Sequence, residues 1–151
     1  MQIYYAHFYL AQLNIAKAKD ELTSIVMKGF VDRLNEINAL ADDSLGFFWR
    51  LQTEEGDATS FKIFDDPSLI LNMSVWENIE SLRNYVYKSV HIELIRGKND
   101  WFHKMNTPHQ VLWHVPVGHI PTVGEGEARL LHLEEHGPTE HAFTFAKPYV
   151  K

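Results

Sequence analysis

The stretch LILNMSVW, residues 69–76, carries a pattern from which the fold of this chain can be predicted. Its odd-numbered positions are all apolar, while its even-numbered positions include Asn72, Ser74 and Trp76. Side chains of a β-strand alternate between the two faces of a sheet, so this period of two predicts a strand with one fully apolar face. Asn78 then suits the N-cap of a helix whose apolar positions share one side, namely Ile79, Leu82 and Val86. The stretch therefore predicts a strand that runs directly into a helix.

The segments on either side extend this pattern. Runs rich in apolar and aromatic residues predict three further strands, over residues 4–15, 46–52 and 109–115. Apolar residues at spacings of three and four predict helices over residues 22–41, from Ser89 past Trp101, and over residues 124–136. Residues 53–68 contain two turn signals and predict a hairpin extension or a flap.

The resulting order is β-α-β-β-α-β. Strands in this order build one antiparallel sheet with helices on one face, which is the ferredoxin-like arrangement of an α+β protein. The length of 151 residues suits one domain. We therefore expect residues 1–151 to form a single domain, with a C-terminal helix and tail from about residue 124.

The composition narrows the classes of function. The chain has no cysteine, which excludes disulfides, thiolate catalysis and cysteine metal sites. Its formal charge of −6 argues against a nucleic-acid partner, because no basic surface is available to hold phosphates. No apolar run approaches the roughly 20 residues of a membrane span, and the N-terminus lacks the pattern of a secretory signal. We expect a cytoplasmic protein without a membrane partner.

Several strands carry large apolar side chains on both faces, as in the consecutive residues Phe47, Phe48 and Trp49. Helices on one face would leave the other face as a large apolar patch, which a soluble monomer avoids. The sequence therefore predicts a homodimer in which two sheets close an α+β barrel around a pocket for a small molecule. The alternative is that the C-terminal helix and tail cover this face within one chain.

Several blocks of the sequence resemble a known family over nearly the whole chain. They are LAQLNI (10–15), LNEINAL (34–40), WRLQ (49–52), NMSVWE (72–77), WHVPVGH (113–119), HGPT (136–139) and AFTF (142–145). The chain thereby resembles an uncharacterised bacterial family, domain of unknown function 3291, of the dimeric α+β-barrel superfamily. That superfamily includes cofactor-independent antibiotic-biosynthesis monooxygenases, haem enzymes and proteins that only bind small molecules. The resemblance implies the same dimeric fold.

The first candidate site is the polar set on the strand at residues 69–76. Period-two geometry points Asn72, Ser74 and Trp76 to one face. The resemblance implies that an Asn and a Trp in such positions hold a phenol oxygen and stack on its ring, with an Arg assisting. Arg50 suits that part if its strand lies beside this one, and Arg96 is the alternative. The structural alternative is that Trp76 anchors the start of the helix and Asn72 bonds the backbone.

The second candidate is His91, on one side of a predicted helix with Trp101. A neutral histidine suits a general base at pH 7, and it equally suits a haem ligand or a hydrogen-bonded structural residue. With Trp76 and Trp101, we expect Trp49 and Trp113 to line the aromatic pocket. His114 and His119, at the end of the fourth predicted strand, form a weaker candidate.

The string HLEEH, residues 132–136, matches a zinc-peptidase motif and places His132 and His136 on one face of a helix. We reject that function, because such enzymes take a third ligand from a distant helix and only fifteen residues follow here. No metal site and no cofactor are expected, with haem as the alternative. The leading hypothesis is a small-molecule enzyme, which oxygenates an apolar or aromatic substrate in the barrel without a metal. The alternatives are a haem-dependent oxygenase and a non-catalytic binding protein.

Overall fold

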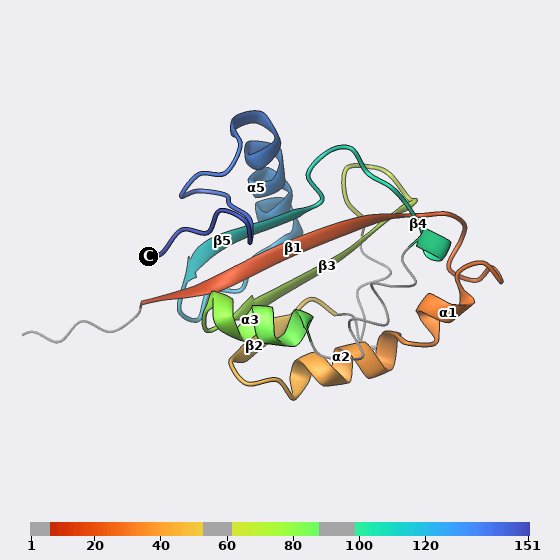
Figure 1. Ribbon diagram of the computed structural model, residues 1–151, viewed down its shortest axis with the longest axis horizontal. Helices are drawn as coiled ribbons and strands as arrows, with labels where there is room; N and C mark the ends of the chain where they lie inside the picture. The colour runs from red at the N-terminus through yellow and green to blue at the C-terminus, as the bar shows by residue number, and fades with distance from the viewer. Residues whose placement is uncertain (1–6, 53–61, 88–98) are drawn as a thin grey trace, which may run out of the picture.

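The computed structural model describes residues 7–52, 62–87 and 99–151. Five strands and four helices lie within these residues (Figure 1). The strands are β1 (Phe8–Ala18), β2 (Phe47–Arg50), β3 (Leu69–Trp76), β4 (Phe102–His103) and β5 (Gln110–Pro116). The helices are α1 (Lys28–Val31), α2 (Leu34–Asp42), α3 (Ile79–Val86) and α5 (Val123–His136).

The strands form one antiparallel sheet. β3 lies between β2 and β1, and the other edge of β1 pairs with β5 along its first half and with β4 at its end. The register places Gln12 of β1 between Ser74 of β3 and Leu112 of β5. Leaving the short β4 aside, this is the ferredoxin-like strand order, so the predicted fold class is confirmed.

The strand predictions at residues 46–52, 69–76 and 109–115 agree with β2, β3 and β5 to within two residues at each end. The first strand, Phe8–Ala18, ends three residues later than predicted, and the first three residues of its predicted range lie outside the described residues. The helix predicted from Ser89 past Trp101 is wrong at its end: the described chain leaves the helix after Trp101 and forms β4, whose two residues are too short to show a period. The predicted flap and the helix from Ser89 lie mostly outside the described residues.

The helix predicted over residues 22–41 is wrong in its first half. The chain turns at Asp32 and Arg33, so that α1 and α2 are separate helices. Phe30 of α1 packs with Met27 near one end of the sheet, and α2 extends from this cluster, through Leu34, to the cluster at the other end, through Ala41. Val26, part of the predicted apolar stripe, is 42% exposed, because Met27 takes the buried position instead.

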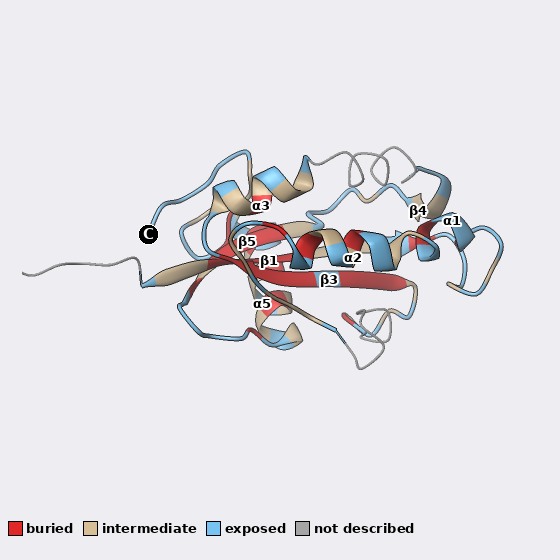
Figure 2. Ribbon diagram, turned by 90° about the horizontal axis from the view of Figure 1, so that it is seen from below, coloured by how far each residue is buried: buried red, intermediate tan, exposed pale blue. Residues whose placement is uncertain are grey.

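Helices lie on both faces of the sheet, as Figure 2 shows. Even-numbered strand residues such as Leu10 and Trp76 pack with Leu82 of α3, on the face that α2 and α3 cover. Odd-numbered residues such as Leu13 and Met73 pack with Leu130 and Leu133 of α5, on the opposite face. We call these the helix-pair face and the α5 face.

The prediction of helices on one face therefore needs a correction. It holds for α2 and α3, but α5 covers the second face of the sheet within the same chain, which was the alternative considered above. The buried residues of the α5 face include Ala11, Met73, Val111 and Trp113. The homodimer stays a prediction, and it no longer follows from an uncovered apolar face.

The tail after α5 returns to the sheet. Gly137 ends the helix with a φ of +73°, a conformation that suits glycine. Phe143 then pairs with Leu112 at the free edge of β5 and is completely buried.

No helix within the described ranges is long and apolar enough to cross a membrane.

Candidate functional site

A polar network lies on the helix-pair face of the sheet. Gln12 of β1 donates through Nε2 to Asn72 Oδ1 at 2.7 Å and to Ser74 Oγ at 2.9 Å. The Nε1 of Trp76 donates to the same Ser74 oxygen at 2.8 Å. Gln12, Ser74 and Trp76 are buried, so these bonds satisfy polar groups that would be costly to leave without partners. The predicted grouping of Asn72, Ser74 and Trp76 on one face is confirmed.

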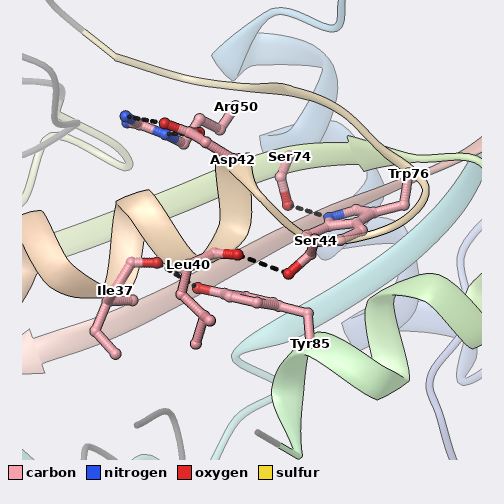
Figure 3. A network of polar contacts seen from close by, with 8 residues as sticks. All are labelled: Ile37, Leu40, Asp42, Ser44, Arg50, Ser74, Trp76 and Tyr85. Carbon is pink, nitrogen blue, oxygen red and sulfur yellow. Dashed lines mark hydrogen bonds and ion pairs between the residues drawn. The ribbon is translucent and has the colours of Figure 1, made fainter.

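Trp76 is completely buried in an aromatic cluster (Figure 3). Tyr85 of α3 stacks on its ring at 5.1 Å, and Phe47 of β2 meets it edge-on at 5.4 Å. The hydroxyl of Tyr85 donates to the Ile37 carbonyl of α2 at 3.3 Å, and burial raises the pKa of Tyr85 to about 12. Trp76 thus fixes α3 against the sheet, as the structural alternative expected.

Arg50 lies beside this network, at the end of β2. Its strand pairs with β3 so that Arg50 is opposite Ser74, which meets the condition set for its role. Its Nε donates to Asp42 Oδ1 at 2.8 Å and its Nη2 to Asp42 Oδ2 at 3.3 Å (Figure 3). The Arg50 side chain is only 12% exposed, so this bidentate pair joins β2 to the end of α2 in a fixed geometry. The alternative residue, Arg96, lies outside the described residues.

Asn72 is the exposed member of the network. Its Oδ1 accepts from Gln12, and among the described residues its Nδ2 has no acceptor. Gln12 thereby sets the orientation of the amide, with Oδ1 toward the protein and the two N–H donors left for another acceptor. Asn72 lies between two apolar clusters of this face, one around Trp76 and one around Ile70.

The four predicted pocket tryptophans do not lie together. Trp101 packs in the Ile70 cluster, with its ring 6.0 Å from that of Phe30, so Trp76 and Trp101 flank Asn72 from opposite ends. Trp49 and Trp113 pack on the α5 face, where Trp113 donates to Glu125 Oε2 at 2.9 Å. Two surface hollows lie beside α1 and between the start of β5 and the tail, and neither is lined by Asn72, Ser74 or Trp76.

The expected location inside a barrel therefore also needs a correction. The face that a second sheet would cover is the α5 face, whereas Asn72, Ser74, Trp76 and Arg50 lie on the helix-pair face. The period of two in a strand predicted that Asn72, Ser74 and Trp76 share a face. The same period does not show which face of the sheet the helices cover.

The histidines separate into different surroundings. His91 lies outside the described residues. His119 bonds Glu125 Oε1 at 2.7 Å near the start of α5, and His114 packs on Phe143 with the ring centres 5.1 Å apart. The rings of His132 and His136 lie side by side on α5 at 4.4 Å, as predicted. Within the part of the chain that the structure describes, no group of three His, Asp or Glu side chains is arranged to hold a metal ion.

Sequence reasoning missed three residues of this site: Gln12, Asp42 and Tyr85. Gln12 carried a detectable signal, since it is a polar residue inside an otherwise apolar part of a strand and needs a buried partner. Asp42 and Tyr85 carried none, because their contacts depend on how α2 and α3 lie on the sheet.

Comparisons with known proteins place the chain in a family. Residues 9–151 match the family described as "Domain of unknown function (DUF3291)". No curated protein matches the chain. Similar solved structures include a conserved protein from Methanosarcina mazei Go1, at 9% identity and a TM-score of 0.52, covering 73% of this chain and 93% of that one.

Two further solved structures are similar to the chain. Protein SO0527 from Shewanella oneidensis is 8% identical with a TM-score of 0.51, covering 72% of this chain and 92% of its own. A variant of SnoaB, a cofactor-independent oxygenase from Streptomyces nogalater, is 9% identical with a TM-score of 0.49, covering 76% of this chain and 97% of its own. Similarity at such identities concerns the fold alone. The match over residues 9–151 shows that the chain belongs to the DUF3291 family.

Proposed function

We propose that this protein binds an apolar aromatic molecule beside Asn72 and oxygenates it without a metal or an organic cofactor. The orientation of Asn72 carries the proposal. Gln12 occupies its carbonyl oxygen at 2.7 Å, so the exposed amide offers N–H donors to an acceptor such as a phenol oxygen. The partly exposed members of the apolar clusters on either side of Asn72, among them Tyr85 and Trp101, supply the surface that would contact the rings.

The chemistry needs only the substrate and dioxygen. A phenolate transfers an electron to dioxygen more readily than a phenol does, and hydrogen-bond donors aimed at its oxygen favour the anion. With 1-naphthol as the probe, one oxygen atom enters the ring as a new carbonyl. The other oxygen atom leaves as water, with the hydroxyl proton and the ring hydrogen, to give a naphthoquinone. Arg50, opposite Ser74, lies at this end of the site as the ion pair with Asp42.

His91 stays the predicted base that removes the phenol proton, and its place lies outside the described residues. The haem alternative depended on the same histidine, and no observation on the described residues favours it. A spectrum of the purified protein with added haemin tests it directly.

Oxygen uptake with 1-naphthol tests the proposal. We expect uptake with formation of a naphthoquinone, and a rate about a hundredfold lower in Asn72→Ala, the size of effect seen when one donor to a developing anion is removed. Asn35→Ala, on the exposed side of α2, is the matched control and should keep the wild-type rate. Binding of 1-naphthol without oxygen uptake would contradict the oxygenase and favour a small-molecule binding protein.

A further inference from the structure

Residues 139–145 join the two faces of the protein. They follow α5, which lies on the α5 face, and they bring Phe143 to the cluster of Leu10 and Trp76 on the helix-pair face. Phe143 exchanges two backbone hydrogen bonds with Leu112, each 2.8 Å long, at the free edge of β5. We call residues 139–145 the C-terminal clasp, because they close over this edge of the sheet.

His114 lies beneath the clasp. Its ring centre is 5.1 Å from that of Phe143, and its Nδ1 is buried without a hydrogen-bond partner among the described residues. A second proton on this ring would place an unpaired charge in that position, which is costly. Burial lowers the pKa of His114, Lys151 lowers it further, and Glu140 acts in the opposite direction. The closed clasp thus favours neutral His114.

His141 holds the clasp from the other side, against α5. Arg129 Nη1 donates to the His141 carbonyl at 2.8 Å and contacts His141 Nδ1 at 3.1 Å. A ring nitrogen accepts a hydrogen bond from a guanidinium only while it is unprotonated. Burial lowers the pKa of His141, and the nearby Arg129 and His132 lower it further. This contact also favours a neutral ring.

Glu140 opposes this effect at His114 but does not reverse it. On α5, the His132 ring lies 4.6 Å from that of His141 and 4.4 Å from that of His136. The carboxylates nearby interact with other groups. The charge of Glu125 raises the pKa of Arg129. Glu135 lies 3.7 Å from His136, and Glu140 lies 3.7 Å from Lys151.

We propose that the C-terminal clasp is proton-sensitive: it stays closed over β5 while His114 and His141 are neutral, and it opens when they take up protons. The direction follows from linkage. Both histidines bind a proton more weakly in the closed form, so the clasp is fully stable above their ordinary pKa of 6.5 and weakens as the pH falls below it. Opening would free the β5 edge at Leu112 for pairing with another strand.

Amide hydrogen exchange at pH 7.5 and pH 5.5 tests the proposal. The amides of Leu112 and Phe143 report on the clasp, and the amide of Ile15, bonded to His109, reports on the sheet. We expect the protection factors of Leu112 and Phe143 to fall at pH 5.5, by up to about tenfold per pH unit for each proton taken up, while that of Ile15 is unchanged. Equal protection at both values, or an equal fall at all three amides, would overturn the proposal.

Two variants identify the groups responsible. His141→Gln keeps an acceptor for Arg129 that cannot be protonated, and His114→Leu removes the buried ring nitrogen. We expect each single variant to lose less protection at pH 5.5 than the wild type, and the double variant to lose none. The control His103→Gln, at an exposed position of β4, should lose as much protection as the wild type. A wild-type loss of protection in the double variant would contradict the assignment. If His114→Leu does not fold, the test rests on His141→Gln alone. A wild-type loss of protection at pH 5.5 in that variant would contradict the assignment.

Discussion

One hydroxyl oxygen organises the candidate site. Ser74 Oγ accepts from both Gln12 and Trp76, and this side chain is 8% exposed, so water cannot easily replace either bond. The sequence predicted that Ser74 and Trp76 share a face, because a strand has a period of two. It could not predict Gln12 as their partner, because that contact needs the pairing of β1 with β3.

Ser74→Ala should lower the free energy of unfolding by about 1 to 3 kcal/mol, since the Trp76 indole N–H is left buried without an acceptor. Denaturant unfolding measures the difference. Ser24→Ala is the control: the Ser24 hydroxyl is buried and makes no hydrogen bond with the described residues, so its removal should cost nothing. Equal losses in the two variants would show that the network adds no stability.

Tyr85 should make the protein sensitive to alkali. Its pKa rises from 10.0 to about 12 on folding, so the folded state retains the phenolic proton more strongly than the unfolded state. This contribution, about 2 to 3 kcal/mol, is complete below pH 10 and is lost as the pH rises from 10 to 12. Unfolding at pH 9 and pH 11.5 should show a smaller loss in Tyr85→Phe than in the wild type. Tyr87→Phe, at a position 68% exposed, should behave as the wild type does.

Among the elements, β3 and α3 lie where the sequence predicted them, and α1 does not. β3 has the predicted bounds because its alternation leaves only one register with an apolar face toward α5. α3 begins where predicted because Asn78 Oδ1 accepts from the Ser81 backbone N–H at 2.9 Å. The break between α1 and α2 has no such local signal, since the residues on either side of it make no side-chain cap.

Asn78→Ala should therefore destabilise the protein by about 1 kcal/mol, the usual cost of losing an N-cap. Thermal or denaturant unfolding gives the value. The control is Asn35→Ala within α2, where alanine favours the helix and stability should stay the same or rise slightly. An unchanged stability in Asn78→Ala would mean that the contacts of Trp76 and Leu82, not the cap, hold α3 in place.

For the molecule as a whole, the sequence predicted the strand order but not the cover of each face. The apolar run in β5 correctly indicated that both faces are buried there, and the covering element on the second face proved to be α5 of the same chain. In β2 the same reasoning failed, because the register shifts between Phe47 and Trp49 and Phe48 is 39% exposed. The position of α5 depends on long-range packing of Leu130 and Leu133, which no local pattern specifies. For the same reason, Trp49 and Trp113 were expected beside Asn72 and lie on the other face.

The homodimer is tested by sedimentation equilibrium at micromolar concentration. The resemblance to dimeric α+β-barrel proteins predicts a mass twice the 17.5 kDa of one chain. A mass of one chain across this range would remove the predicted partner, and it would leave the Asn72 site intact, because that site lies on the helix-pair face.

We propose that Asn72 donates a hydrogen bond to an oxygen atom of an aromatic ligand. The most direct test of this proposal compares the affinities of 1-naphthol and naphthalene for the wild type and for Asn72→Ala, by isothermal titration calorimetry. We predict that the wild type binds 1-naphthol about three- to tenfold more tightly than naphthalene, as one hydrogen bond allows, and that Asn72→Ala binds the two alike. The same preference for 1-naphthol in both proteins, or no preference in the wild type, would contradict the account.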